Sequence, residues 1–193
     1  VMSPLLAHCK IMRKEFGEDI KIVFVGPCIA KKFEADKNSS LLNLSISFRD
    51  LRRWLREKGI NYHNIEPQKG IDFVYKHASK GRYYPIEGGM IETIKQYGKT
   101  DNVYMMQLTG LNNIKRELCT IKESLPDVPV FIECLACEGG CVSGPCTKIN
   151  KSGFEKRTRI LKDVALENNA NLTNKSHDIS KNYDKNPIIK KNY

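Results

Sequence analysis

Four cysteines lie in one short glycine-rich loop directly after an apolar stretch, and this arrangement constrains the fold more than any other feature of the chain. The apolar residues 128–133 run into a loop that carries Cys134, Cys137, Cys141 and Cys146. Soft thiolates crowded on a flexible loop are the ligand set that a zinc ion or an iron-sulfur cluster requires. The end of this strand is therefore the predicted location of the functional site.

A second strand-to-loop junction presents a cysteine in the same way. The apolar residues 21–25 break at Gly26-Pro27, and Cys28 follows immediately. The two junctions are far apart in sequence, yet both place a thiol just after a strand. We therefore predict one shared site, formed by Cys28 and the later loop.

Composition limits the class of protein. With 193 residues, 40% of them hydrophobic, the chain can bury one sizeable core or two small lobes. No apolar run approaches the roughly 18 to 20 residues needed to cross a bilayer, and no leader pattern opens the chain. The seven cysteines are odd in number and clustered, which argues against a disulfide framework. The prediction is a cytoplasmic protein without a membrane partner.

The net charge of +10 raises the question of nucleic-acid binding. About half of this charge comes from residues 151–193, where lysines are mixed with asparagines. No basic stripe interleaved with aromatic residues occurs, so a nucleic-acid partner is not expected. Residues 167–193 are predicted to be a polar, disordered tail behind a domain that spans residues 1–166.

Periodicity and capping signals alternate along the domain. Helices are predicted from Ser3-Pro4 to Gly17, from Ser47 to Gly59, after Gly88-Gly89, over 111–123 and over 154–166. Strands are predicted over 20–25, 103–108 and 128–133. Strands separated by helices indicate an α/β fold with parallel pairing, in which sites gather at the carboxyl ends of strands.

Several side chains are predicted to be structural. The helix before Gly59 places its large apolar residues on one face, which predicts that Trp54 is buried. Cys9 and Cys119 lie within helices and are interpreted as packed side chains. Cys134 has two interpretations, one as a buried strand residue and the other as a partner of Cys137 in a Cys-x-x-Cys pair.

The spacing of the thiols bears on the kind of metal. A structural zinc site usually shows two tight cysteine pairs, or cysteines with histidines, and only Cys134 and Cys137 have that spacing here. Cys137 and Cys141 are separated by Glu-Gly-Gly, whose glycines let the backbone wrap around a bulky inorganic group and expose amides to anionic sulfides. Cluster binding is favoured, and a structural zinc or thiol domain stays as an alternative.

The two cysteine segments together resemble a known family. The segment 26–32 with Glu34, and the segment 131–141, are similar to the second and third signature loops of the C-terminal domain of iron-only (di-iron) hydrogenases. The resemblance extends over most of residues 1–166. It implies sheet-and-helix lobes with the cluster cleft at the carboxyl ends of the strands. That cleft would hold a 4Fe-4S cluster joined through a cysteine to a di-iron subcluster.

The resemblance also implies roles for individual residues. Cys28 and Cys137 match ligands of the cluster, and Cys141 matches the cysteine that joins the cluster to the di-iron unit. Lys31 matches a lysine that donates a hydrogen bond to a cyanide ligand of that unit, and Glu34 is positioned to orient Lys31. Lys31 and Glu34 are accordingly the catalytic candidates.

The chain also departs from the family pattern. The first signature loop, Thr-Ser-Cys-Cys-Pro, is absent and on the family order would precede Val1, so we expect an N-terminally truncated domain. Cys146 is a further candidate ligand that could complete the site. Gly26, Leu135 and Glu138 stand where catalytic members carry methionine, methionine and proline. This variant is similar to a hydrogenase-like branch fused to ferredoxin and sensory domains.

Three functions follow from the sequence. The leading one is an iron-sulfur module for redox or hydrogen sensing, or for electron transfer, with a ferredoxin-like donor or fused ferredoxin and sensory domains as partners. The second is a fragment of a catalytic hydrogenase that interconverts protons and hydrogen. The third is the structural zinc or thiol domain, which would have no need for Lys31 beside Cys28.

Overall fold

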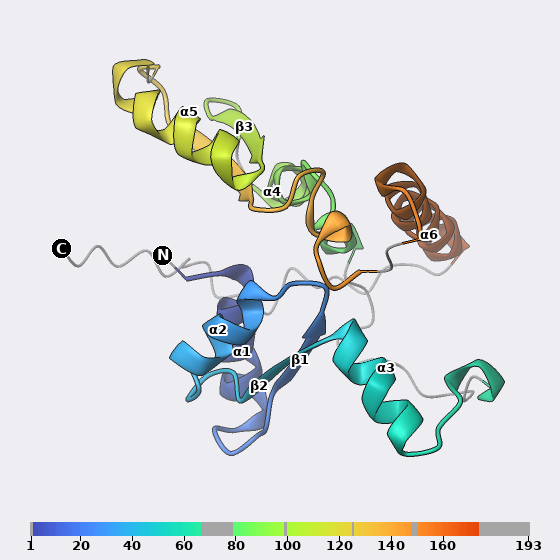
Figure 1. Cartoon of the computed structure of the whole chain (residues 1–193). Coiled ribbons are helices and arrows are strands. Elements are labelled where there is room, and N and C mark those ends of the chain that lie inside the picture. The colour runs from blue at the N-terminus through green and yellow to red at the C-terminus, as the bar shows by residue number, and fades with distance from the viewer. Residues whose placement is uncertain (1, 67–78, 99, 125, 148–149, 174–193) are drawn as a thin grey trace.

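Two pairs of parallel strands, each joined through a helix, organise the chain (Figure 1). The structure is a computed structural model that describes residues 2–66, 79–98, 100–124, 126–147 and 150–173. Strands β1 (Val23–Gly26) and β2 (Leu44–Ser47) pair in parallel, and helix α2 (Ala30–Lys37) lies between them in the chain. Strands β3 (Tyr104–Thr109) and β4 (Val130–Leu135) also pair in parallel, and helix α5 (Leu111–Ser124) lies between them in the chain. Each pair is a β-α-β unit, because parallel strands need a crossover between them.

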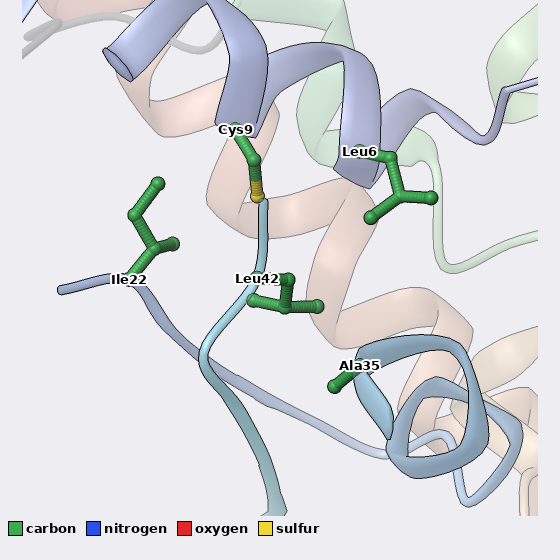
Figure 2. Packing of buried hydrophobic residues seen from close by; sticks show 5 residues of the cluster. All are labelled: Leu6, Cys9, Ile22, Ala35 and Leu42. Atoms are coloured by element: carbon green, nitrogen blue, oxygen red, sulfur yellow. The ribbon is translucent and has the colours of Figure 1, made fainter. Parts of the chain in front are cut away.

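The core of the first unit lies between helix α1 (Pro4–Phe16) and the β1–β2 pair. The Ser3 hydroxyl caps α1 by accepting the Leu6 N–H at 3.3 Å, and the helix ends at Gly17, as predicted. The buried side chains come from α1, α2 and the segments that enter the two strands (Figure 2): Leu6, Cys9, Ile22, Ala35 and Leu42. The interpretation of Cys9 as a packed core residue is confirmed, since it is 1% exposed.

Helix α3 (Phe48–Glu57) begins directly after β2 with a capping box. The Ser47 hydroxyl accepts the Asp50 N–H at 3.1 Å, and the Asp50 carboxylate accepts the Ser47 N–H at 2.9 Å. The prediction that Trp54 is buried is wrong, since its side chain is 55% exposed. The helix is amphipathic as predicted, but none of its residues is buried by the described part of the chain.

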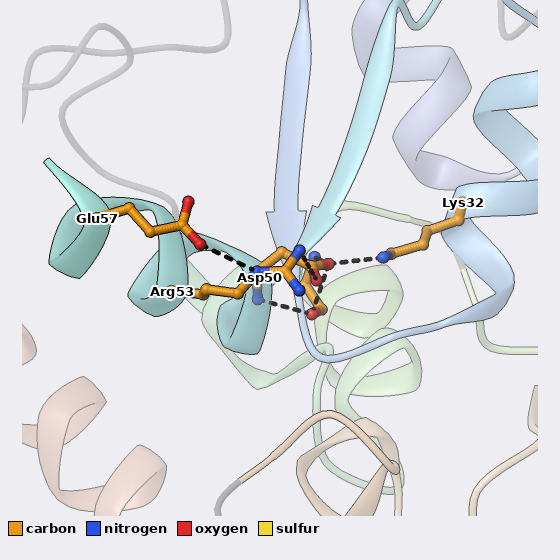
Figure 3. Close-up of polar contacts among 5 residues, drawn as sticks. Lys32, Asp50, Arg53 and Glu57 are labelled. Carbon is orange, nitrogen blue, oxygen red and sulfur yellow. Dashed lines mark hydrogen bonds and ion pairs between the residues drawn. The ribbon is translucent and has the colours of Figure 1, made fainter.

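Asp50 also joins α3 to α2, because Lys32 Nζ lies 2.6 Å from its Oδ2 atom (Figure 3). The pKa of the Asp50 carboxyl is well below its usual range. The main cause is the hydrogen bond from Lys32, and the hydrogen bonds from the Ser47 N–H and hydroxyl add to it. A depressed folded-state pKa contributes stability above the ordinary aspartate pKa of about 3.9, and this contribution is lost as the pH falls. The charge on Asp50 is therefore a stabilising feature at neutral pH.

We expect Asp50→Asn to lower the urea midpoint of unfolding at pH 7, and the difference between the two proteins to shrink as the pH falls below about 4. Asparagine retains the capping oxygen, so the substitution removes the charge and leaves the cap acceptor in place. The measurement is urea unfolding of both proteins at a series of pH values. A gap between their midpoints that stays constant from pH 7 to pH 3 would contradict the role of the charge.

The second unit carries α4 (Gly89–Tyr97) before β3, and the last described element is α6 (Gly153–Thr173). Short 3-10 turns η1 (Tyr62–Asn64), η2 (Ser79–Tyr83) and η3 (Cys141–Ser143) connect the elements. Helix α6 packs against η2 and η3, and Arg157 Nη2 lies 3.4 Å from Glu87 Oε2. Because α6 runs to Thr173, the helix continues past the predicted domain end at residue 166. The rest of the predicted tail lies outside the described residues.

The sequence located most of these elements, but helix α2 was not predicted, because residues 30–37 are mostly charged and have no apolar period. Strand β2 was not predicted, because Leu44-Ser-Ile-Ser is a short segment whose serines lower its apolar signal. Cys119 and Cys134 are exposed, so the interpretation of both as packed side chains is wrong. In the described part of the chain, no helix is both long enough and apolar enough to cross a membrane.

Candidate metal centre

The two predicted cysteine loops meet at the carboxyl ends of their strands. Cys28 follows the end of β1, and Cys137 follows the end of β4. A Cβ atom placed on Gly144 would lie 3.3 Å from the Pro27 carbonyl oxygen and 3.5 Å from Cys137 Sγ. The loop after β4 therefore packs directly on the loop after β1. This is the juxtaposition that the two strand-to-loop junctions predicted.

Three of the thiols influence one another electrostatically. Burial raises the pKa of the Cys141 thiol, and the neighbouring Cys28 and Cys137 thiols raise it further, while the Lys31 ammonium opposes them. Burial and then the Cys28 thiol raise the pKa of Cys137. A metal that binds thiolates must displace these protons, so loading of this site should release protons and improve as the pH rises.

Lys31 supplies the positive charge near these thiols. It lies in the first turn of α2, just after Cys28, and its Nζ atom is 2.5 Å from Glu34 Oε2. Both side chains are largely covered, with 26% of Lys31 and 20% of Glu34 exposed. The contact agrees with the expectation that Glu34 orients Lys31. Their assignment as catalytic residues stays a prediction.

The loop that carries Cys141 is braced by the segment before α4. The Val142 N–H donates to the Pro85 carbonyl at 3.0 Å. Gly140 has φ = 91°, and a Cβ atom there would lie 2.7 Å from the same Pro85 oxygen. Only glycine fits both the backbone conformation and this close approach. The turn at residues 139–140 is thus shaped by its packing on residues 85–87.

Glu133 holds that bracing segment in place. Its carboxylate is 1% exposed and accepts the Gly88 N–H and the Ile91 N–H, each at 3.1 Å. These donors lie at the N-terminus of α4, where a carboxylate is favoured by the unpaired N–H groups and the helix dipole. Strand β4 therefore contributes Glu133 to the support of the site, and the loop that follows it contributes Cys137 to the site itself. The family resemblance left two interpretations of Glu133, a functional acid or a carboxylate that is exposed or braces a loop, and these contacts support the bracing role.

The remaining thiols of the loop lie at its margins. Cys134 is exposed on β4, and Cys146 is half-buried after η3. Arg49 Nη2 donates to the Pro145 carbonyl oxygen at 3.4 Å, which ties this end of the loop to the start of α3. The sequence did not indicate that contact. Cys146 thus directly follows a residue whose carbonyl group is hydrogen-bonded to α3. Its role as a ligand stays a prediction.

The residues that are present fit an iron-sulfur cluster in their chemistry. Three thiols, a nearby ammonium group and a glycine-rich turn face one junction between the two loops. Thiolates are the usual ligands of such clusters. Among the described residues, no three histidine, cysteine or acidic side chains are gathered closely enough to hold a single metal ion. The assignment of the thiols as cluster ligands is therefore based on their chemistry and on the packing of the two loops, and not on a preformed metal site among the described residues.

Comparison with known proteins places the chain in a family. The sequence profile of the iron-only hydrogenase large subunit, C-terminal domain, matches residues 1–145. The chain belongs to this family. Iron hydrogenase 1 of Clostridium pasteurianum is 26% identical over an alignment 166 positions long, which covers 66% of this chain and 29% of that protein. The chain thus spans less than a third of the length of this curated hydrogenase.

Solved structures of FeFe-hydrogenases share the fold. A structure that describes stepwise H-cluster assembly in HydA superimposes with a TM-score of 0.50 at 18% identity, covering 81% of this chain and 57% of that one. HydA1 of Chlamydomonas reinhardtii, in a variant form, gives a TM-score of 0.48 at 17% identity with the same coverage. The predicted hydrogenase-like α/β fold is confirmed.

Proposed function

We propose that this hydrogenase-family chain is an iron-sulfur module that holds a 4Fe-4S cluster for electron transfer or redox sensing. The observation that carries the proposal is the packing of the loop that follows β1, with Cys28 and Lys31, against the loop that follows β4, with Cys137 and Cys141. In this proposal the three thiolates hold the cluster, with Cys146 as a further candidate ligand. When bound, the cluster supplies a site that can take up and release an electron.

Lys31 has a defined task in this module. Its ammonium group is directed by Glu34 and opposes the negative charge that would gather on the three thiols. A fixed positive charge near a cluster favours the reduced, more negative state. The position of Lys31, which Glu34 fixes, should therefore influence how readily the bound cluster takes up an electron.

The loop sequences support a redox role over turnover of hydrogen. Catalytic members carry methionine where this chain has Gly26, and here a Cβ atom at that position would lie 2.4 Å from Cζ of Phe24. The Phe24 ring thus occupies the space in which a longer side chain would begin. Together with Leu135 and Glu138, this change alters the surroundings that a di-iron subcluster would have.

A second candidate function is that of a fragment of a catalytic hydrogenase, with a di-iron subcluster beside the 4Fe-4S cluster. The specific observation in its favour is that the curated relative and the solved structures are all named as hydrogenases. In that case Cys141 would join the two parts of the cofactor, and Lys31 would face the di-iron unit. A ferredoxin-like donor, separate or fused, is the proposed partner under either function.

One experiment separates the two functions. The chain is reconstituted with iron and sulfide, exposed to hydrogenase maturation machinery and assayed with reduced methyl viologen. The redox module should bleach reversibly with dithionite and evolve no hydrogen. Hydrogen evolution that Cys141→Ala stops would instead establish the catalytic fragment. A chain that neither bleaches nor evolves hydrogen would refute both functions.

A further inference from the structure

Helix α3 carries four arginines, and the structure engages only some of them. Arg49 donates to the Pro145 carbonyl oxygen, and Arg53 lies 4.0 Å from Asp50 Oδ1 and 3.8 Å from Glu57 Oε1 (Figure 3). Among the described residues, neither Arg52 nor Arg56 has a hydrogen-bond acceptor or an ion-pair partner. Arg52 and Arg56 are one helical turn apart and therefore share a face of α3.

That face opens on a pocket at the end of α3. The pocket has a volume of about 500 Å³ and is lined by Arg52, Arg56, Gly59, Ile60, Asn61 and Tyr62. Gly59, with φ = 69°, turns the chain back after the helix, so residues 60–62 form a wall opposite the arginines. The two arginines without partners are thus the two that face this pocket.

The wall supplies further groups for a ligand. The side-chain oxygen of Asn61 accepts the His63 N–H at 3.2 Å, which leaves the amide NH₂ of Asn61 as a donor. The Tyr62 ring packs on His63 with ring centroids 4.3 Å apart and is 43% exposed. Tyr62 and Ile60 therefore offer an aromatic and apolar surface beside the two guanidinium groups.

The charge balance of the pocket identifies the class of ligand. Arg52 is half-buried, so its guanidinium group has lost part of its hydration without gaining an acceptor from the described residues. No acidic side chain lines the pocket. Guanidinium groups bind phosphate oxygens with two parallel hydrogen bonds, and two of them at one site suit a dianionic group. We propose that this pocket binds a phosphate monoester that also carries a planar ring, which is the chemistry of a nucleoside monophosphate.

A confined ligand fits the observations better than a long polyanion. The next arginine along the helix, Arg53, is partnered by Asp50 and Glu57, so the positive charge is concentrated on the pocket face. A nucleic acid would need a basic track that extends beyond one turn of helix. The phosphate group binds Arg52 and Arg56, and the ring lies against Tyr62 and Ile60.

The test is calorimetric titration of the full chain with AMP, inorganic phosphate and adenosine at constant ionic strength. We expect saturable binding of AMP, weaker binding of phosphate and none of adenosine. Arg52→Ala and Arg56→Ala should each weaken AMP binding about tenfold, the usual effect of removing a charge-assisted contact. Arg53→Ala is the matched control, because its side chain is on the same helix and already partnered, and it should change the affinity less than twofold.

Three results would overturn the proposal. The first is the absence of saturable binding of both AMP and phosphate. The second is an equal loss of affinity in Arg53→Ala and Arg52→Ala, which would indicate a diffuse charge effect of the whole helix. The third is tighter binding of a single-stranded oligonucleotide than of AMP per phosphate, with no dependence on Arg56, which would indicate a nucleic-acid surface. Because no cluster is required for the titration, its outcome is independent of the proposed redox function.

Discussion

Glu133→Ala should lower the free energy of unfolding by about 3 kcal/mol. The substitution leaves the partly buried Gly88 N–H and the buried Ile91 N–H without an acceptor, and a buried unsatisfied group costs about 1–3 kcal/mol. It also removes the negative charge from the N-terminus of α4. Because the segment at residues 85–88 braces the loop of Cys141, the same variant should load less iron. Urea unfolding and iron content after reconstitution measure the two effects.

Two further variants show whether this loss arises from the two hydrogen bonds. Glu133→Gln retains one acceptor oxygen and should lose about half as much stability. Glu92→Ala, in the first turn of α4, removes an exposed carboxylate that pairs with Lys80 and Lys95, and it should cost less than about 1 kcal/mol. If Glu133→Ala and Glu92→Ala were equally stable, the proposed bracing role of Glu133 would be wrong.

Cys28→Ala and Cys137→Ala should each abolish retention of the cluster after reconstitution. Each change removes one of the three thiols that the proposal assigns to the cluster, and alanine supplies no ligand in its place. The expected observation is loss of the brown visible absorbance and of bound iron, while the free energy of unfolding of the metal-free chain changes little. Iron and acid-labile sulfide are counted per chain after removal of excess reagents.

Cys119→Ala is the matched control for these variants. Cys119 is an exposed cysteine on α5, away from both loops, and its removal should leave the iron count unchanged. If Cys28→Ala and Cys137→Ala retained the full cluster, the ligand assignment would be refuted. If Cys119→Ala lost the cluster to the same extent, the absorbance would reflect iron bound by any surface thiol.

The features that the sequence predicted correctly depend on local signals. Ser3, Pro4 and Gly17 fix α1 through capping, and the Ser47–Asp50 box fixes the start of α3, because each cap needs only residues a few positions apart. Burial depends instead on what packs against an element. The amphipathic pattern of α3 predicted a buried Trp54, yet in the described part of the chain no element covers that side chain.

The sequence also predicted part of the candidate site: it placed the cysteine loops together but did not reveal the contacts that support them. The meeting of the two loops was predicted from the carboxyl ends of parallel strands. In the structure β1 and β4 belong to different two-stranded sheets, so the loops meet because the two β-α-β units pack together there. The pairing of Lys31 with Glu34 was an expectation from the family resemblance, and the structure places the two residues three positions apart on α2. The support of the site did not follow, because Glu133 and Pro85 reach their partners across long sequence separations that no local pattern encodes.

The most direct test of the account is anaerobic reconstitution of the full chain with iron and sulfide. Iron, zinc and acid-labile sulfide are then counted per chain, and the visible spectrum is recorded. The account predicts about four irons with matching sulfide and a brown absorbance that dithionite bleaches. A colourless chain that binds zinc, or no metal at all, would contradict the proposal that Cys28, Cys137 and Cys141 hold an iron-sulfur cluster.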